Sequence, residues 1–172
     1  MKLLILTRYA QLGASSRLRF LQYIPYFQQQ GFRIDTQPFF DDADLRVFYQ
    51  IGKYGVAIIS KAYLKRIKTL LNAKNYDLIW IEKEALPWLP TTIERSLLKN
   101  KRYALDFDDA IFHNYDQHTS IVVRKLLGKR IDTLMHHAVI ITAGNPYLAQ
   151  RAITAQAPRV EVTPTVINLE QY

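Results

Sequence analysis

KLLILTRYAQLGASSRLRF, residues 2–20, has the pattern of a strand, a short turn and the start of a helix. The nearly continuous apolar run within Lys2 to Thr7 is typical of a parallel strand that is covered on both faces. A helix is expected from Ser15 or Ser16, either of which can cap it, to a stop at Gly31, with a kink at Pro25. This combination predicts the opening βα unit of an α/β domain.

The same alternation continues along the chain, so the sequence predicts one domain over residues 1–172. We expect a doubly wound, parallel, six-stranded Rossmann-like sheet with helices on both faces, in the default strand order 3-2-1-4-5-6. The second strand alternates apolar and polar residues, which favours a place nearer an edge. The expected strands are Lys2 to Thr7, Phe32 to Pro38, Asp77 to Glu82, Arg102 to Phe107, Ala138 to Thr142 and Arg159 to Thr163.

Longer amphipathic segments separate these strands and are expected to be helical. A basic, aromatic-rich helical region should be broken near Gly52 to Gly55. No internal repeat or flexible linker suggests a second domain. Besides the helix that begins at Ser15 or Ser16, the expected helical segments are Leu45 to Ala73, Leu86 to Lys99, Ser120 to His136 and Pro146 to Ala155.

Size and composition limit the class of protein. The chain has 172 residues, of which 49% are apolar, enough for one sizeable core. It has no cysteine, which excludes disulfides and thiolate metal sites. The first apolar run ends at Thr7, too early for a signal peptide, and no segment is apolar enough to span a membrane. We therefore expect a cytoplasmic protein.

The net charge of +8 favours a polyanionic neighbour. Nucleic acid, anionic lipid headgroups and phosphorylated ligands all qualify, and a basic surface without a specific partner is the alternative. Two basic amphipathic segments, residues 62–71 and 122–135, can lie peripherally on the anionic inner face of the membrane or cover the sheet.

The turn after the first strand is the first candidate site. Hydroxyl and guanidinium groups there, including those of Arg17 and Arg19, can bind phosphate or sugar oxygens. The turn has a single glycine and matches neither a dinucleotide fingerprint nor a P-loop. The alternative is that Ser15 only caps the helix and the arginines are solvated. The candidate substrate-binding residues are Gly13, Ala14, Ser15, Ser16 and Arg17.

The segment ALDFDDAIF after the fourth strand is the second candidate site. Clustered carboxylates are costly unless they bind a cation, accept hydrogen bonds from ligand hydroxyls or pair with bases. Strand alternation puts Asp106 and Asp108 on one face, and Asp108 and Asp109 are the candidate catalytic residues. Helix caps and salt bridges are the alternative explanation.

Two further turns should reach the same edge of the sheet. Glu82 and Lys83 follow the third strand, and Thr142 and Asn145 lie at the end of the fifth, where Asn145 can cap a helix. Trp88 can stack on a sugar ring or simply pack. The histidines lack metal-ligand spacing, so we assign no metal.

Four segments in this order resemble the N-terminal domain of a retaining GT-B type glycosyltransferase of the large family 4, or group 1. They are GASSRLRF after the first strand, DFDDAIF after the fourth, VIITAGNPYL at the fifth, and VEVTPTVINLEQY at the end of the chain. The last is similar to the family segment V-x-P-N-G-V-D-x-x-x-F, although Thr165, Val166 and Asn168 replace its Asn, Gly and Asp.

The resemblance implies that this chain is the half that binds a saccharide or lipid-linked acceptor. In the family, a C-terminal domain binds the nucleotide-sugar donor, so we expect no cofactor in this half and no activity from it alone. Residues 13–17 would face the donor phosphates and the acceptor. Asp108 stands where the family often has the His of a His-Asp pair, which implies contact with the acceptor.

Two other functions remain open from the sequence. LDFDDAIF resembles the D-x-D-G-T-L motif of haloacid dehalogenase type phosphatases, in which Asp106 would attack phosphate and Asp108 would be the acid/base. A non-catalytic basic module that binds RNA or a partner subunit is the other, but no stacking platform for single strands is evident. We therefore expect no specific nucleic acid.

Overall fold

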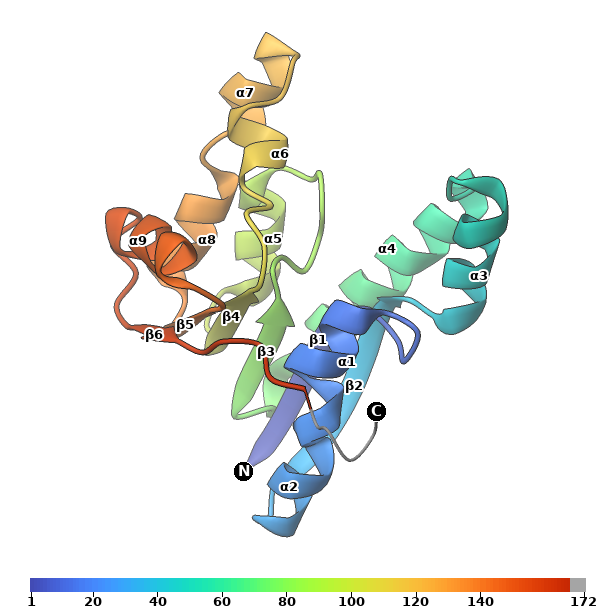
Figure 1. Ribbon diagram of the computed structural model, residues 1–172, viewed down its shortest axis with the longest axis vertical. Helices are drawn as coiled ribbons and strands as arrows, with labels where there is room; N and C mark the ends of the chain where they lie inside the picture. Colours follow the sequence, from blue (N-terminus) through green and yellow to red (C-terminus); the bar gives the residue numbers. More distant parts are fainter. Residues whose placement is uncertain (168–172) are drawn as a thin grey trace.

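The computed structural model describes residues 1–167 and shows an α/β domain built on one parallel sheet (Figure 1). Within these residues the sheet has six strands, in the order β2-β1-β3-β4-β5-β6, and every neighbouring pair is parallel. The predicted fold class and all six predicted strands are confirmed. The strands are β1 (Lys2–Tyr9), β2 (Arg33–Phe40), β3 (Leu78–Glu82), β4 (Tyr103–Phe107), β5 (Ile140–Ala143) and β6 (Val160–Val162).

The predicted strand order 3-2-1-4-5-6 is wrong. After β2 the chain crosses back over the sheet, and β3 pairs with the other side of β1. The reason lies in β2, where Arg33, Asp35 and Thr36 are exposed and Pro38 has no backbone N–H to donate. Such a strand stabilises an edge position, whereas the apolar β3 is stabilised between two neighbours.

Several helices differ in extent from the prediction. The expected break after Ile51 is confirmed, and Pro25 lies in the first turn of α2, so the first helical run is split rather than kinked. The segments expected at residues 86–99 and 120–136 are shorter or divided. The helices are α1 (Ala14–Arg19), η1 (Leu21–Tyr23), α2 (Ile24–Gln29), α3 (Asp42–Ile51), α4 (Val56–Leu71), η2 (Ala73–Asn75), α5 (Thr91–Leu98), α6 (His113–Asp116), α7 (Ile121–Leu127), α8 (Arg130–His137) and α9 (Pro146–Thr154).

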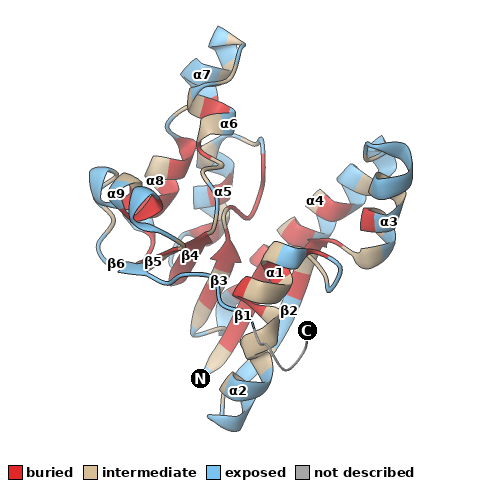
Figure 2. Cartoon of the chain, viewed as in Figure 1, coloured by how far each residue is buried: buried red, intermediate tan, exposed pale blue. Residues whose placement is uncertain are grey.

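Helices cover both faces of the sheet, and burial concentrates in the central strands (Figure 2). Alternate residues of β1 point to opposite faces: Leu3 and Ile5 pack with Phe20 under α1 and α2. Leu4 and Leu6 join the larger core on the other face, beneath α4, α5, α8 and α9. No helix in the described part of the chain is both long and apolar enough to cross a membrane.

Two helical arms extend past the carboxyl ends of the strands (Figure 1). One arm consists of α3 and the first half of α4, and the other of α6 and α7. Both arms carry exposed residues at their tips (Figure 2). The candidate residues at the end of β1, β3 and β4 lie at the sheet edge from which these arms extend.

Candidate functional site

The site lies at the carboxyl ends of the central strands, next to the point where the strand order changes direction. From β1 the chain leads to β2 on one side of β1, and it then returns to β3 on the other side. In open α/β sheets such a switch point, at the carboxyl ends of the strands, is where ligands bind. The first turn of α1 and the residues that follow β3 and β4 meet here, and we call this set the rim cluster. Its members are Ser15, Ser16, Glu82, Lys83, Asp108 and Asp109.

Ser15 joins the ends of β3 and β4. Its Oγ lies 2.8 Å from Oε1 of Glu82 and 2.6 Å from Oδ2 of Asp108. Ser16 Oγ donates to Oε2 of Glu82 at 2.6 Å and accepts from the amide of Tyr9 at 3.0 Å. Ser15 or Ser16 was expected to cap the helix, and this is wrong because the helix begins at Ala14 and its N-cap is Gly13, which has no side chain.

The contacts of Ser15 require a proton on one of the two carboxyl groups. A serine hydroxyl has one hydrogen, so it cannot donate to both Glu82 and Asp108. Burial raises the pKa of Glu82 above its usual range, despite hydrogen bonds from Ser16 and from the amide of Arg8 that favour the anion. We assign the extra proton to Oε1 of Glu82, which then donates to Ser15 while Ser15 donates to Asp108. The three groups form a chain along which a proton can move.

Lys83 holds the outer part of the cluster. Its Nζ lies 2.7 Å from Oδ2 of Asp109 and 3.0 Å from Oδ1 of Asp108. Burial opposes ionisation of Asp108, but Lys83 and Ser15 outweigh it and hold the pKa of this carboxyl below its usual range. The same carboxylates keep the pKa of Lys83 above its usual value, also against burial. Asp108 is therefore an anion and Lys83 a cation over the physiological pH range.

Two features of the cluster are typical of binding sites. Lys83 has a backbone φ of 65°, in the left-handed region, which costs a non-glycine residue on the order of 1 kcal/mol. Oδ1 of Asp108 is buried and receives no hydrogen bond from the described residues, although Lys83 lies close to it. This oxygen is therefore held by its ion pair with Lys83 rather than by a well-aligned hydrogen bond.

Gly13 and Arg17 shape the loop before α1. A Cβ atom on Gly13 would lie 2.2 Å from Cβ of Tyr9, so the loop can pass β1 only with glycine at this position. Arg17 donates from Nη1 to the carbonyl of Gln11 at 2.9 Å, and Ala14 is exposed. These residues border the cluster.

A buried ion pair lies beneath the cluster. Nε of Arg19 donates to Asp106 Oδ2 at 2.8 Å, and Nη2 donates to Oδ1 at 2.5 Å. Thr142 Oγ1 also donates to Oδ1, at 2.5 Å. The alternative that Arg19 lies on a solvated face is wrong, because its side chain is buried against Asp106. Its predicted contact with a ligand stays a prediction. The sequence had no local signal for a pair 87 residues apart.

The turn after β5 does not join the rim cluster. Asn145 Oδ1 accepts from the amide of Leu148 at 3.0 Å, which confirms its predicted role as a helix cap. Thr142 bonds Asp106 rather than Asp108. Trp88 is 47% exposed and packs edge-on against Tyr115, with a ring-centroid distance of 5.0 Å. The predicted packing of Trp88 is confirmed, and its stacking on a sugar ring stays a prediction.

The arrangement around Asp106 disfavours phosphatase chemistry. Both carboxylate oxygens accept hydrogen bonds from Arg19 or Thr142, which lowers their nucleophilicity. Burial raises the pKa of Asp106, although Arg19 and Thr142 counteract it. Among residues 1–167, no group of three or more His, Asp or Glu side chains is placed to hold a metal ion. The bonded state of Asp106 therefore counts against the phosphatase alternative.

A cavity adjoins the ion pair on the α1–α2 face of the sheet. It has a volume of about 240 Å³. Its walls are mainly apolar, and Arg19, Asp106 and Thr142 supply its polar end. The segment after β6 crosses in front of it, since Arg19 Nη1 donates to the carbonyl of Thr163. The lining residues are Leu18, Arg19, Tyr23, Phe27, Trp80, Asp106, Thr142 and Thr163.

No protein-family model and no curated protein sequence matches the chain. The case for a function therefore rests on the geometry and charge of the rim cluster.

Proposed function

We propose that the chain is the acceptor-binding half of a retaining glycosyltransferase, and that the rim cluster binds hydroxyl groups of a saccharide or lipid-linked acceptor. The observation that carries the proposal is the contact of one hydroxyl, that of Ser15, with two carboxyl groups from neighbouring strands, Glu82 and Asp108. A sugar hydroxyl has the same donor and acceptor capacity as serine and can replace or extend this contact.

The charges of the cluster suit a polyhydroxyl ligand. Ionised Asp108 accepts hydrogen bonds from sugar hydroxyls, which are stronger than neutral ones because the acceptor is charged. Lys83 can donate to sugar oxygens, and its three donors are not exhausted by Asp108 and Asp109. Asp108 is the candidate group for direct contact with the reacting hydroxyl, with Asp109 beside it.

The proposed donor is a nucleotide sugar held mainly by a second domain. In the glycosyltransferase family that the sequence resembles, the donor phosphate takes the acceptor proton. The role assigned to this chain is therefore to hold and orient the acceptor. We expect it to be inactive alone, and a cytoplasmic location belongs to the same proposal. The basic arm at α7, with exposed Ile121, Val122 and Leu126, supports peripheral contact with an anionic membrane that carries the acceptor.

Ligand-observed NMR with methyl glycosides tests the proposal. Saturation transfer from the chain to methyl α-D-glucoside, α-D-mannoside and α-D-galactoside is compared for the wild type and the variants Ser15→Ala and Asp108→Asn. We expect transfer to at least one glycoside, weakened roughly fivefold or more in both variants, because each loses a hydrogen bond to the ligand.

The control variant is Asp35→Asn. Asp35 is an exposed carboxylate on β2 that also accepts a hydrogen bond and pairs with a lysine, but it lies outside the rim cluster. Binding should be unchanged in this variant. Absence of transfer to all three glycosides, or equal transfer in all variants, would refute the proposal.

A further inference from the structure

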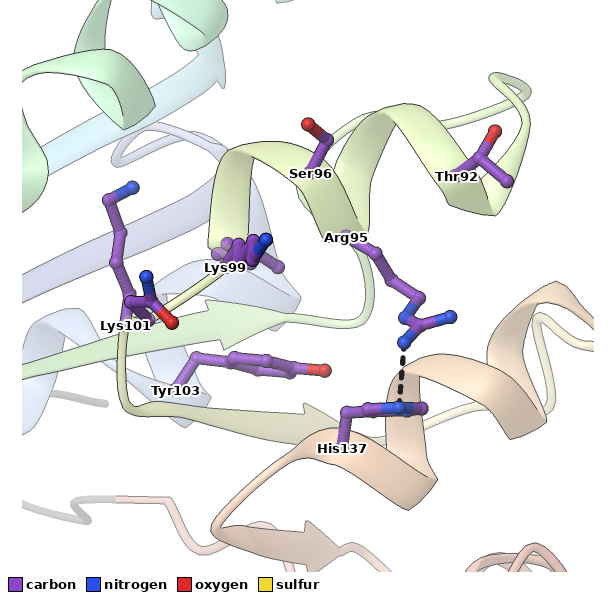
Figure 3. Close-up of a pocket in the computed structure, with 9 residues that line it drawn as sticks. Thr92, Arg95, Ser96, Lys99, Lys101, Tyr103 and His137 are labelled. Atoms are coloured by element: carbon purple, nitrogen blue, oxygen red, sulfur yellow. Dashed lines mark hydrogen bonds between the residues drawn. The ribbon is translucent and has the colours of Figure 1, made fainter.

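A hollow separate from the cavity beside Arg19 lies near the amino end of β4, at the opposite end of the strands from the rim cluster. It has a volume of about 540 Å³ and opens between α5, the end of α8 and the loop before β4 (Figure 3). The five residues of β4 separate its loop from Asp108, roughly 16 Å along the strand. Its lining residues are Thr92, Arg95, Ser96, Leu98, Lys99, Asn100, Lys101, Tyr103 and His137.

The hollow is basic. Three side-chain cations line it, from Arg95, Lys99 and Lys101, and no carboxylate does. Nδ1 of His137 lies 2.8 Å from the carbonyl of Thr133, so Nδ1 carries the hydrogen and Nε2 accepts from Arg95 at 2.9 Å. This contact uses one of the five donors of Arg95 (Figure 3).

A smaller basic hollow adjoins it along α5. This one has a volume of about 310 Å³, shares Thr92 and Arg95 with the first, and adds Lys125 and Lys129. Again no carboxylate is among its lining residues. Its remaining cation, Arg130, is buried and paired with Glu84 and Glu94, so it is not available to a ligand. The two hollows together form what we call the α5 groove.

Helix ends reduce the positive potential of the α5 groove without cancelling it. The carboxyl ends of α5 and α8 point to it, and each carries about half a negative charge. Lys101 offsets one of them by donating to the carbonyl of Leu97 at 2.6 Å. Arg95 and Lys99, with Lys125 and Lys129 in the adjoining hollow, still leave an excess of positive charge.

Neutral donors and a rigid floor complete the groove. The hydroxyls of Thr92 and Ser96 lie on the same face of α5, four residues apart, and neither has a hydrogen-bond partner among the described residues. Tyr103 is buried at the hollow, below α5 in the view of Figure 3. Its hydroxyl donates to the carbonyl of Leu134 at 2.8 Å. Free donors around an excess of positive charge are what phosphate oxygens require.

We propose that the α5 groove binds a small ligand with more than one phosphate group, independently of the rim cluster. A hollow of about 540 Å³ exceeds a single phosphate, and the basic residues lie at both ends of α5 with Arg95 between them. The concave shape suits a free diphosphate-type ligand rather than the flat surface of a bilayer.

Isothermal titration calorimetry with inorganic pyrophosphate, at low ionic strength in a phosphate-free buffer, tests this inference. We expect binding to the wild type that weakens about tenfold or more in Arg95→Gln/Lys99→Gln, because two charge-assisted contacts are lost. The control Arg46→Gln/Lys53→Gln removes the same two residue types from the exposed surface of the α3 arm and should bind like the wild type.

Further outcomes separate this site from its alternatives. Pyrophosphate binding should persist in Asp108→Asn, which distinguishes the α5 groove from the rim cluster. The inference is overturned if pyrophosphate does not bind, or if both double variants weaken binding equally. It is also overturned if Arg95→Gln/Lys99→Gln impairs binding only to phosphatidylglycerol vesicles or only to RNA.

Discussion

Glu82 is the residue at which the protonation state of the site can be measured. Oε1 of Glu82 and Oδ2 of Asp108 both contact the hydroxyl of Ser15, and burial raises the pKa of Glu82. Glutamine has the shape of a protonated glutamate and can donate to Ser15 in the same way. The substitution Glu82→Gln should therefore preserve the hydrogen bonds of the cluster.

Stability against pH gives the first prediction. A carboxyl group whose folded pKa is raised contributes stability below its unfolded pKa of about 4.3, and this contribution is lost as the pH rises towards the folded pKa. Above about pH 4.3, the free energy of unfolding of Glu82→Gln should therefore increase relative to that of the wild type. Each unit by which the folded pKa of Glu82 exceeds its unfolded pKa adds about 1.4 kcal/mol to this difference in the free energy of unfolding.

Denaturant unfolding of both proteins from pH 4 to pH 8 measures this difference. A variant that loses stability relative to the wild type as the pH rises would show that Glu82 is ionised and that the proton is misassigned.

Gly13 provides a residue-scale prediction about the loop. Gly13→Ala places a methyl group within 2.2 Å of Tyr9 Cβ, so the loop must move. We expect a loss of about 1–3 kcal/mol in the free energy of unfolding, measured with urea. Gly55→Ala is the control, because nothing lies within 4 Å of the added methyl group. Equal losses in the two variants would contradict the close approach of the loop to β1.

At the scale of elements, the apolar runs were the reliable signal in the sequence. β1 is buried on both faces, and β3 is buried on one face and half-buried at Leu78 and Trp80 on the other. Their apolar runs are too continuous for an exposed strand. The strand order was mispredicted, although the alternation in β2 and its Pro38 already favoured an edge position. An edge position for β2 excludes a third strand on its outer side and hence the default order.

Helix boundaries were less predictable for a physical reason. Ser15 and Ser16 have the residue type of a helix cap, but the N-cap of α1 is Gly13, and the serine hydroxyls contact carboxyl groups at the ends of β3 and β4. Those carboxylates lie at least 66 residues away in the sequence. Local patterns therefore cannot show which partner a serine takes.

The α7 arm provides a prediction at this scale. Leu126 is 71% exposed beside Lys125, and burying such a side chain in a bilayer interface gains about 1.5–3 kcal/mol. Leu126→Glu should reduce flotation of the chain with phosphatidylglycerol vesicles roughly tenfold. Ile153→Glu, at a residue 56% exposed on α9, should leave flotation unchanged. Flotation insensitive to Leu126→Glu would remove α7 from any membrane contact.

At the scale of the whole molecule, the geometry of a parallel sheet explains which site residues were predictable. The carboxyl ends of β1, β3 and β4 meet at one edge, so the gathering of Ser15, Glu82 and Asp108 follows from the fold class. Thr142 and Asn145 lie one strand further and bond elsewhere. The pairing of Arg19 with Asp106 depends on the depth of α1 against the sheet, which sequence periodicity does not specify.

The charges of the molecule are divided between two ends of the sheet. Carboxylates dominate the rim cluster, whereas the α5 groove at the opposite edge is lined by cations alone among its charged groups. A net charge of +8 thus coexists with an acidic site for the proposed acceptor.

Whether the rim cluster binds sugar hydroxyls can be measured by a two-dimensional ¹⁵N–¹H NMR titration of the whole chain with the methyl glycoside that binds best. We expect shifts concentrated in the amides of residues 13–16, 82–84 and 107–109. Shifts confined to other parts of the molecule, or no shifts at saturating glycoside, would contradict a hydroxyl-binding site at this rim.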